Sequence, residues 1–245
     1  MMRRLLDIVA AGLGLLLVGI PLAVILFLVW RQDGHSPFYV ADRAGLGGAP
    51  FRMVKIRSMI VHADKSGVES TSASDNRITP LGHFIRRWKV DELSQLWNVL
   101  RGDMSLVGPR PNTLNEVATY ADWERRLLLV RPGITDFSSI VFSDEGEILR
   151  GSNDPDADYA RLIRPWKGRL GLLYAENKGF LLNLALIFLT VVAVASKPRA
   201  LAALQPLLRR CGADQELLVT ARRDQPLAGR DEPLTEPERT EPMPR

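Results

Sequence analysis

The sequence predicts an α+β fold that is mostly helical and is preceded by an apolar N-terminal membrane helix. Three observations lead to this prediction. Residues 8–30 are apolar and uncharged, short alternating stretches typical of strands follow, and apolar residues then recur at helical spacing. With 245 residues, 46% of them hydrophobic, the chain is long enough for one sizeable globular core plus appendages.

Composition excludes several kinds of site. Cys211 is the single cysteine, which rules out an intramolecular disulfide framework and a cysteine zinc cage. The three histidines have no spacing typical of metal ligands, so a metal here would be a hard cation bound by oxygen. The 32 basic residues nearly balance the 28 acidic ones, and we therefore expect no nucleic-acid partner.

The N-terminal apolar run is long enough to cross a bilayer, at about 1.5 Å per residue. Arg31-Gln32-Asp33 follows it instead of a small-residue cleavage site, so we interpret residues 1–34 as a membrane anchor and not as a signal peptide. Basic residues at both ends draw both toward the cytoplasm, and Pro21 removes a helix hydrogen bond near the middle. A single-pass helix and a hairpin that enters and leaves one leaflet both fit these residues.

Short elements follow the anchor. "FRMVKIRSM" (residues 51–59) alternates as a strand does, residues 63–77 form a polar loop, and "PLGHFIRRW" (residues 80–88) is typical of a short helix. Leucines and Trp97 then recur at helical spacing over residues 93–100, with Gly102 as a C-terminal cap. Asp91 and Glu92 fall at the start of that helix, where the macrodipole favours negative charge. A second amphipathic helix is expected from about residue 115 to 130.

The last part of the chain combines helices with a tail. The loop "RPGITDFSS" (residues 131–139) precedes a helix over about residues 158–174, whose basic and aromatic residues fit a membrane surface or a basic face over a core equally well. Residues 180–195 are short for a crossing and contain Asn183, so we favour a core or interfacial helix. The globular domain is expected at residues 35–200, and residues 201–245 are expected to be a disordered tail, basic and then rich in proline and charge.

The acid pair Asp91-Glu92 is the main candidate for chemistry, although such pairs more often only start a helix. Neighbouring helix positions point about 100° apart, so one carboxylate could attack a substrate while the other moves a proton. Attack on a phosphate needs cations, because unit charges about 4 Å apart repel by about 4 kcal/mol at an effective dielectric of about 20. The basic residues available are Lys55, Arg57, Arg86, Arg87, Lys89, Arg110 and Arg131. Mg²⁺ on Asp91 would add to them.

Several stretches resemble the monotopic phosphoglycosyl transferases, bacterial sugar transferases that start the assembly of lipid-linked glycans. The matching stretches are "FRMVKIRSM", "RITPLGHFIRRWKVDELSQLWNVLRGDMSLVGPRP", "RPGIT" and "RPWKGRLGLLY", which together cover most of residues 1–200. The resemblance implies a re-entrant membrane helix hairpin broken near Pro21, with both ends cytoplasmic. A cytosolic catalytic domain with interfacial amphipathic helices would then lie on the cytoplasmic face of the bacterial inner membrane.

The resemblance also implies a Mg²⁺-dependent reaction in two steps. Asp91 attacks the β-phosphate of a UDP-sugar and releases UMP, and polyprenyl (undecaprenyl) phosphate then takes the sugar phosphate from the aspartate. Glu92 assists as an acid/base or by orienting the metal. The substrate-binding candidates are Lys55, Arg57, Arg86, Arg110 and Arg131. The implied partners are the UDP-sugar, polyprenyl phosphate and membrane lipid, with a homodimer as an option.

Three positions depart from the family pattern. Ile56 replaces the usual phenylalanine, which is a packing change. Ile20 precedes Pro21 where a serine is often found, which leaves the depth of the membrane helix open. Asn183 stands where the last apolar helix usually begins with an aspartate, and this could weaken metal or phosphate handling or shift it to another carboxylate. The competing interpretation is a membrane-tethered scaffold in which Asp91 and Glu92 merely cap a helix. The sequence does not identify the sugar.

Overall fold

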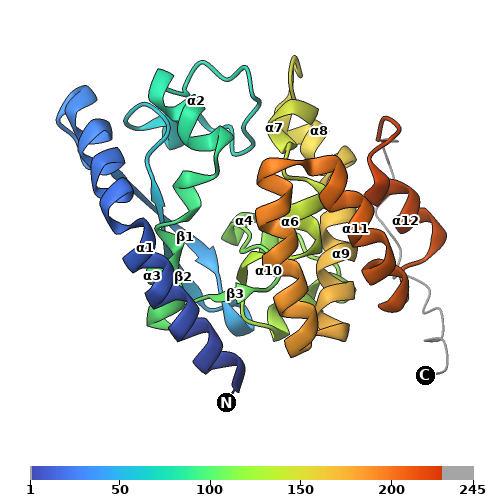
Figure 1. Ribbon diagram of the computed structural model, residues 1–245. Coiled ribbons are helices and arrows are strands. Elements are labelled where there is room, and N and C mark those ends of the chain that lie inside the picture. Colours follow the sequence, from blue (N-terminus) through green and yellow to red (C-terminus); the bar gives the residue numbers. More distant parts are fainter. Residues whose placement is uncertain (1, 228–245) are drawn as a thin grey trace.

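Helices dominate the architecture, and two small sheets connect them (Figure 1), which confirms the α+β class. The computed structural model describes residues 2–227. Its first half comprises α1 (Met2–Asp33), β1 (Phe38–Ala44), β2 (Pro50–Ile56), α2 (Pro80–Arg87), the short 3₁₀ turn η3 (Val90–Glu92) and α3 (Gln95–Arg101). β2 is the strand that the alternation predicted, and it pairs with β1 in an antiparallel hairpin, with Tyr39 opposite Lys55.

α1 is one helix that runs through Pro21. By length and composition it is the one helix among the described residues that could cross a membrane. A hairpin that turns back near Pro21 is therefore not confirmed. On the outward side of α1, Leu16, Leu17 and Ile20 are each more than 80% exposed.

The start of α1 is bonded to the globular body. The Arg4 guanidinium donates to the carbonyl oxygens of Val99 (2.5 Å) and Leu100 (2.8 Å), at the end of α3. Asp7 is buried, and its carboxylate accepts hydrogen bonds from Ser105 Oγ (2.6 Å) and from the Leu106 amide (3.0 Å). A carboxylate within an apolar helix thus has two donors from the domain, as a buried charge requires.

The end of α1 contacts the same body. Val29 is fully buried against Ile56 of β2 and Ile85 of α2. Asp33 forms an ion pair with Arg57, with Nη1 and Oδ2 2.5 Å apart and Nη2 and Oδ1 2.7 Å apart. Both ends of α1 are therefore anchored on one domain.

The second sheet joins the two halves of the molecule. β3 (Ser105–Val107) and β4 (Gly133–Thr135) are parallel, with Ser105 opposite Gly133 and Val107 opposite Thr135. Gly108 and Gly133 touch backbone to backbone: a Cβ atom built on Gly133 would lie 2.0 Å from the Gly108 nitrogen. The "GPRP" and "RPGIT" segments are therefore held against each other, a contact that sequence periodicity did not predict.

The region expected to be one helix from 115 to 130 is broken into three pieces. They are α4 (Leu114–Ala118), α5 (Asp122–Arg125) and the 3₁₀ helix η4 (Arg126–Leu129). Ala121 is extended, and the Glu124 carboxylate accepts from its amide at 2.8 Å to start α5. With the chain broken here, Tyr120, Trp123 and Leu127 pack together in one buried cluster.

The second half packs around the largest core, seen in yellow to red in Figure 1. Its helices are α6 (Phe137–Val141), α7 (Glu145–Ile148), α8 (Pro155–Leu162), α9 (Arg164–Asn177), α10 (Phe180–Ala195), α11 (Lys197–Arg210) and α12 (Gln215–Arg222). The helix expected at 158–174 is thus divided between α8 and α9.

Helix α9 lies in the core and not at an exposed surface. Leu170 and Tyr174 are fully buried, and Trp166 and Arg169 are nearly so. The buried Arg169 pairs with Asp214 and Glu216 of the α12 region. The basic residues of α9, Arg164, Lys167 and Arg169, pair with acids elsewhere in the chain, as in a basic face over a core.

Helix α10 has one buried and one exposed face, in agreement with a core or interfacial helix. Leu186 and Leu189 point into the core, whereas Leu181 and Phe188 are 79% and 67% exposed. The chain continues as helix through α11 and α12, where a disordered tail was expected from residue 201. Leucines of these helices complete the largest core. The rest of the expected tail, residues 228–245, lies outside the described residues.

Candidate active site

The acid pair lies in the tight turn between α2 and α3. Lys89 precedes it with a left-handed backbone (φ 55°), a conformation that is unusual for a residue other than glycine. The turn is fastened to β2, because Ser94 Oγ donates to the Val54 carbonyl (3.0 Å) and Asn98 Oδ1 accepts from the Val54 amide (3.0 Å). The acids therefore occupy their own 3₁₀ turn, just before the helix that they were expected to start.

Asp91 is a buried carboxylate with one free oxygen. The residue is 8% exposed, and its Oδ1 has no hydrogen-bond partner in the part of the chain that the structure describes. Burial raises the pKa of Asp91, and the positive charge of Lys55 opposes that shift. A desolvated carboxylate oxygen without a donor is a stronger nucleophile than a solvated one.

Glu92 differs from its neighbour because it is paired. Its Oε1 lies 2.8 Å from Arg110 Nη2. Burial alone would raise the pKa of Glu92, but the charges of Arg110, Lys89 and Lys55 outweigh it and lower the pKa to about 2. The attraction of Glu92 in turn raises the pKa of Arg110. The two acids are thereby differentiated, with Glu92 ionised throughout the ordinary pH range.

Lys55 on β2 faces both acids. Burial lowers its pKa to about 8, as does repulsion from Arg110, while Glu92 and Asp91 act in the opposite direction. The site therefore combines two carboxylates with Lys55 and Arg110. Such a cluster can balance the charge of a phosphate group brought to Asp91.

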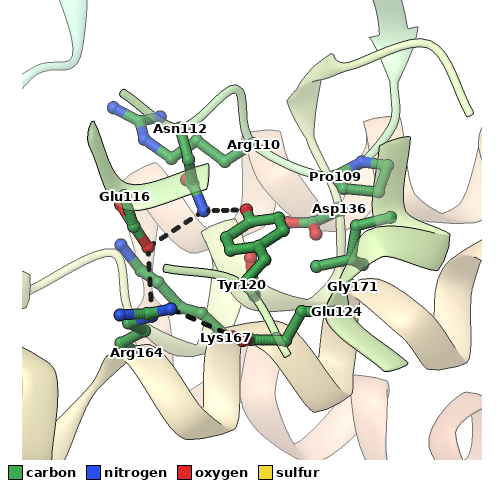
Figure 2. Close-up of a pocket in the computed structure, with 13 residues that line it drawn as sticks. Pro109, Arg110, Asn112, Glu116, Tyr120, Glu124, Asp136, Arg164, Lys167 and Gly171 are labelled. Atoms are coloured by element: carbon green, nitrogen blue, oxygen red, sulfur yellow. Dashed lines mark hydrogen bonds and ion pairs between the residues drawn. The ribbon is translucent and has the colours of Figure 1, made fainter. Parts of the chain in front are cut away.

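A small polar cavity lies behind Arg110 (Figure 2). Its walls come from the segment after β3, from the α4–α5 region, from the start of α6 and from α9. Asn112 Nδ2 donates to Glu116 Oε1 (3.0 Å) and to the Tyr120 hydroxyl (2.6 Å). Arg164 lies between Glu116 and Glu124, 3.6 Å and 3.4 Å away. Most polar groups of the cavity thus satisfy one another.

Comparison with known proteins identifies the family. The family model described as bacterial sugar transferase matches residues 1–197. The chain belongs to the bacterial sugar transferase family. The resemblance noted in the sequence is thereby confirmed.

Named relatives support this membership. Galactosyl transferase CpsE of Streptococcus agalactiae is 36% identical over 202 residues, 76% of this chain and 42% of that protein. The UDP-galactose-lipid carrier transferase of Erwinia amylovora is 31% identical over 214 residues, 81% of this chain and 41% of that protein. The UDP-glucose:undecaprenyl-phosphate glucose-1-phosphate transferase of Caulobacter vibrioides is 36% identical over 174 residues, 67% of this chain and 64% of that protein. This sugar transferase family member spans less than two thirds of the length of each of these three relatives.

Of the other predicted substrate-binding residues in this family member, Arg86 lies near the acid pair, whereas Arg57 and Arg131 have structural contacts. Arg86, in the last turn of α2, is close enough to Asp91 to oppose the rise in its pKa. Arg57 is 9% exposed and is engaged by Asp33 and the Ser36 carbonyl, so it joins α1 to β2. Arg131 contributes its backbone, whose carbonyl oxygen is packed against Gly108. The structure thus brings Lys55, Arg86 and Arg110 to the acid pair.

Other charged residues near the site were missed by sequence reasoning. Arg43 lies next to Ala44, the last residue of β1, whose amide donates to the Asn112 carbonyl at 3.0 Å. Burial lowers the pKa of Arg43, and Arg110 also repels it. Glu145 pairs with Lys167 on the other side of Arg110. The only sequence signal for these residues was their charge, since no spacing connects them to the acid pair.

Asn183 is buried and hydrogen-bonded inside this sugar transferase. It is 3% exposed, and its Oδ1 accepts from the Tyr174 hydroxyl at 2.9 Å. The same hydroxyl lies 3.1 Å from the Val107 carbonyl on β3. Asn183 therefore joins α10 to α9 and β3.

Among residues 2–227, no three potential side-chain ligands of the His, Cys, Asp and Glu types form a metal cage. Glu92 is already committed to Arg110, which leaves Asp91 as the carboxylate with a free oxygen at the acid pair. Mg²⁺ usually binds one or two carboxylates and relies on substrate phosphates and water for the rest. The residues present fit a metal that arrives with a phosphate substrate.

Proposed function

We propose that this chain transfers a sugar-1-phosphate from a UDP-sugar to polyprenyl (undecaprenyl) phosphate, the first membrane step of exopolysaccharide, O-antigen or related glycoconjugate synthesis. The observation that carries the proposal is the buried Asp91 with a free oxygen, beside Lys55 and the Glu92–Arg110 pair. Family membership supports it, as do the substrates in the relatives' names. Those names include both galactose and glucose, so the proposal specifies only a UDP-sugar.

The reaction has two displacements at one phosphorus atom. An Asp91 oxygen bonds to the β-phosphorus of the UDP-sugar, the bond from that phosphorus to the bridging oxygen breaks, and UMP leaves with the bridging oxygen. A phosphate oxygen of polyprenyl phosphate then bonds to the same phosphorus, and the bond to Asp91 breaks. Asp91 attacks as the carboxylate, a form that the charges of Lys55, Lys89 and Arg86 favour against the effect of burial on its pKa. Polyprenyl phosphate attacks through an ionised phosphate oxygen, so neither attacking oxygen carries a proton to remove.

The residues around Asp91 stabilise charge in this scheme. Lys55, Arg110 and Arg86 balance the phosphate oxygens that face the carboxylate. Glu92 holds Arg110 in place and stays ionised, so we assign it a positioning role instead of proton transfer. Mg²⁺, when bound, would supply further positive charge to the diphosphate, held by Asp91 and the substrate's own phosphates.

The proposed location is the cytoplasmic face of the bacterial inner membrane. α1 is apolar and largely exposed on its outer side, which supports membrane association. Its two ends bond to the same domain through Arg4 and Asp7 and through Asp33. This supports an anchor with both ends on one side of the bilayer.

The decisive experiment measures UMP release by the detergent-solubilised protein from a panel of UDP-sugars, with Mg²⁺ and undecaprenyl phosphate. We expect release from one or a few donors, and a loss of at least about 1,000-fold in Asp91→Asn, since the nucleophile is removed. The exposed Asp64→Asn is the matched control and should retain the wild-type rate. Release that survives Asp91→Asn would refute the mechanism. A folded protein that is silent with every donor would favour the membrane-tethered scaffold.

A further inference from the structure

Asp136 is a second buried carboxylate near the candidate site, and its two oxygens are unequal. The residue has no exposed surface and caps the start of α6. Its Oδ1 accepts from Ser138 Oγ (2.7 Å), the Ser139 amide (2.8 Å) and Ser139 Oγ (2.8 Å). Its Oδ2 has no hydrogen-bond partner among the described residues. A buried acceptor without a donor is unfavourable, so this oxygen is suited to a donor from outside the chain.

The free oxygen faces the cavity behind Arg110. Asp136 lines this cavity together with Pro109, Arg110 and Gly171, and Figure 2 shows its carboxylate among these residues. A Cβ atom added to Gly171 would lie 3.9 Å from Oδ2, so the glycine leaves space at this wall. The cavity volume of about 20 Å³ is enough for one water-sized group. A single hydroxyl group fits there, whereas a whole sugar ring does not.

The charges around the cavity select a neutral donor. Its other carboxylates, Glu116 and Glu124, are paired with Arg164. Lys167, the cation that acts on Asp136, is already paired with Glu145. A phosphate or carboxylate would be repelled by the free Asp136 oxygen, whereas a hydroxyl group can donate to it.

We propose that Asp136 is a donor-recognition residue whose free oxygen accepts a hydrogen bond from one hydroxyl group of the transferred sugar. The inference rests on the proposed function, because Arg110 must hold the diphosphate that carries this sugar. On one side Arg110 contacts Glu92, the neighbour of Asp91, and on the other side it lines the cavity. A sugar bonded to the β-phosphate is therefore the part of the substrate expected to reach Asp136. Burial raises the pKa of Asp136, and a hydroxyl donor would counteract this by stabilising the ionised form.

The test combines one substitution in the enzyme with one substitution in the substrate, as in a double-mutant cycle. The wild type and Asp136→Asn are assayed for UMP release with the best UDP-sugar and with its deoxyfluoro analogues, in which a fluorine replaces one sugar hydroxyl at a time. Asparagine caps helices as well as aspartate does and keeps an oxygen for Ser138 and Ser139. Fluorine cannot donate a hydrogen bond. The measured quantity is kcat/KM for each combination.

We expect one analogue to lower the wild-type kcat/KM by about tenfold or more, as for a lost hydrogen bond to a charged group. Asp136→Asn should lower kcat/KM for the normal sugar by a similar factor, and that one analogue should cause little further loss. Ser139→Ala is the matched control, because it removes a donor to Oδ1 and leaves Oδ2 unchanged. It should keep the wild-type discrimination among the analogues.

Three results would overturn the inference. Losses that multiply independently for every analogue would mean that Asp136 acts only on the fold. The same cycle is run with the 2′-deoxyuridine form of the donor, and a coupling confined to it would place the ribose, and not the transferred sugar, at Asp136. Unchanged kinetics in Asp136→Asn would mean that only water occupies the cavity. In each of these cases the wild type still releases UMP. If the proposed function itself were wrong, the wild type would release no UMP from any donor.

Discussion

Lys55 is the residue whose charge is most sensitive to pH in the candidate site. Its pKa of about 8 follows first from burial and then from repulsion by Arg110. The side chain is therefore charged below pH 8 and loses its charge as the pH rises through that value. We expect kcat/KM for UMP release to fall by about tenfold for each unit of pH well above that point, since phosphate binding needs the cation.

The matched variant is Lys55→Arg, which keeps the charge because arginine does not titrate in this range. Its alkaline limb should move to higher pH, whereas the exposed Lys65→Arg should behave as the wild type does. The measurement is the pH profile of UMP release on both sides of pH 8. An identical alkaline limb in the wild type and Lys55→Arg would contradict the assignment to Lys55.

At the residue scale, the sequence was sufficient to nominate the acid pair together with Lys55, Arg86 and Arg110, because these residues lie in motifs. The family resemblance assigned the attack to Asp91 and an assisting role to Glu92, but residue patterns gave no physical reason for the difference, which arises from the contact between Glu92 and Arg110. The sequence also could not separate Arg57 from the other cations, because the partner of Arg57 is Asp33 at the far end of α1. Such pairings depend on tertiary contacts that spacing does not encode.

At the element scale, the pairing of β3 with β4 positions Arg110, and two glycines permit it. The Cβ atom of Gly133→Ala would lie 2.0 Å from the Gly108 nitrogen and 2.6 Å from the Gly108 Cα atom. We expect this substitution to lower the free energy of unfolding by about 3 kcal/mol, because backbone on both sides cannot move aside easily. UMP release should fall as the Arg110 segment is displaced.

The measurement is thermal unfolding of the detergent-solubilised protein, with UMP release on the same preparations. Gly12→Ala on α1 is the control, because a Cβ atom there meets nothing within 4 Å. It should leave the melting temperature unchanged or slightly higher. A Gly133→Ala protein as stable and active as this control would show that the two segments need not approach so closely.

Elements with strong local patterns were predicted well, and those that depend on distant partners were not. Strand β2, α2, α3 with its Gly102 cap, and α10 follow from alternation, helical spacing and capping. The parallel β3–β4 pair has strands of three residues each, too short for a periodic signal. α11 and α12 were taken for a tail because their prolines and basic residues obscured the leucines that the core buries.

For the whole molecule, the central prediction concerns the two ends of α1. Because both ends bond to one domain, single cysteines introduced by Met2→Cys and Gln32→Cys should lie on the same side of the inner membrane. In a Cys211→Ser background, we expect a membrane-impermeant maleimide to leave both unlabelled in intact spheroplasts and to label both after lysis. Asp64→Cys on the globular domain is the cytoplasmic reference.

Labelling of one end only in intact spheroplasts would establish a single-pass anchor and separate one end of α1 from the domain. Such a result would require Arg4 and Asp7, or else Asp33 and Val29, to leave the partners described above. The sequence alone could not decide between these topologies, because flanking charges and Pro21 fit both. The contacts at both ends of α1 support the same-side arrangement, and the labelling experiment tests it.

The one-sided exposure of α1 also affects how the protein would look once extracted from the membrane. Leu16, Leu17 and Ile20, each more than 80% exposed, point away from the body that holds the ends of the helix. A spanning protein is encircled by a belt of detergent at mid-height. With both ends of α1 on one side of the bilayer, as proposed, this molecule would instead carry its micelle as a lateral cap on the outer face of α1, and the rest of the body would stay in contact with water.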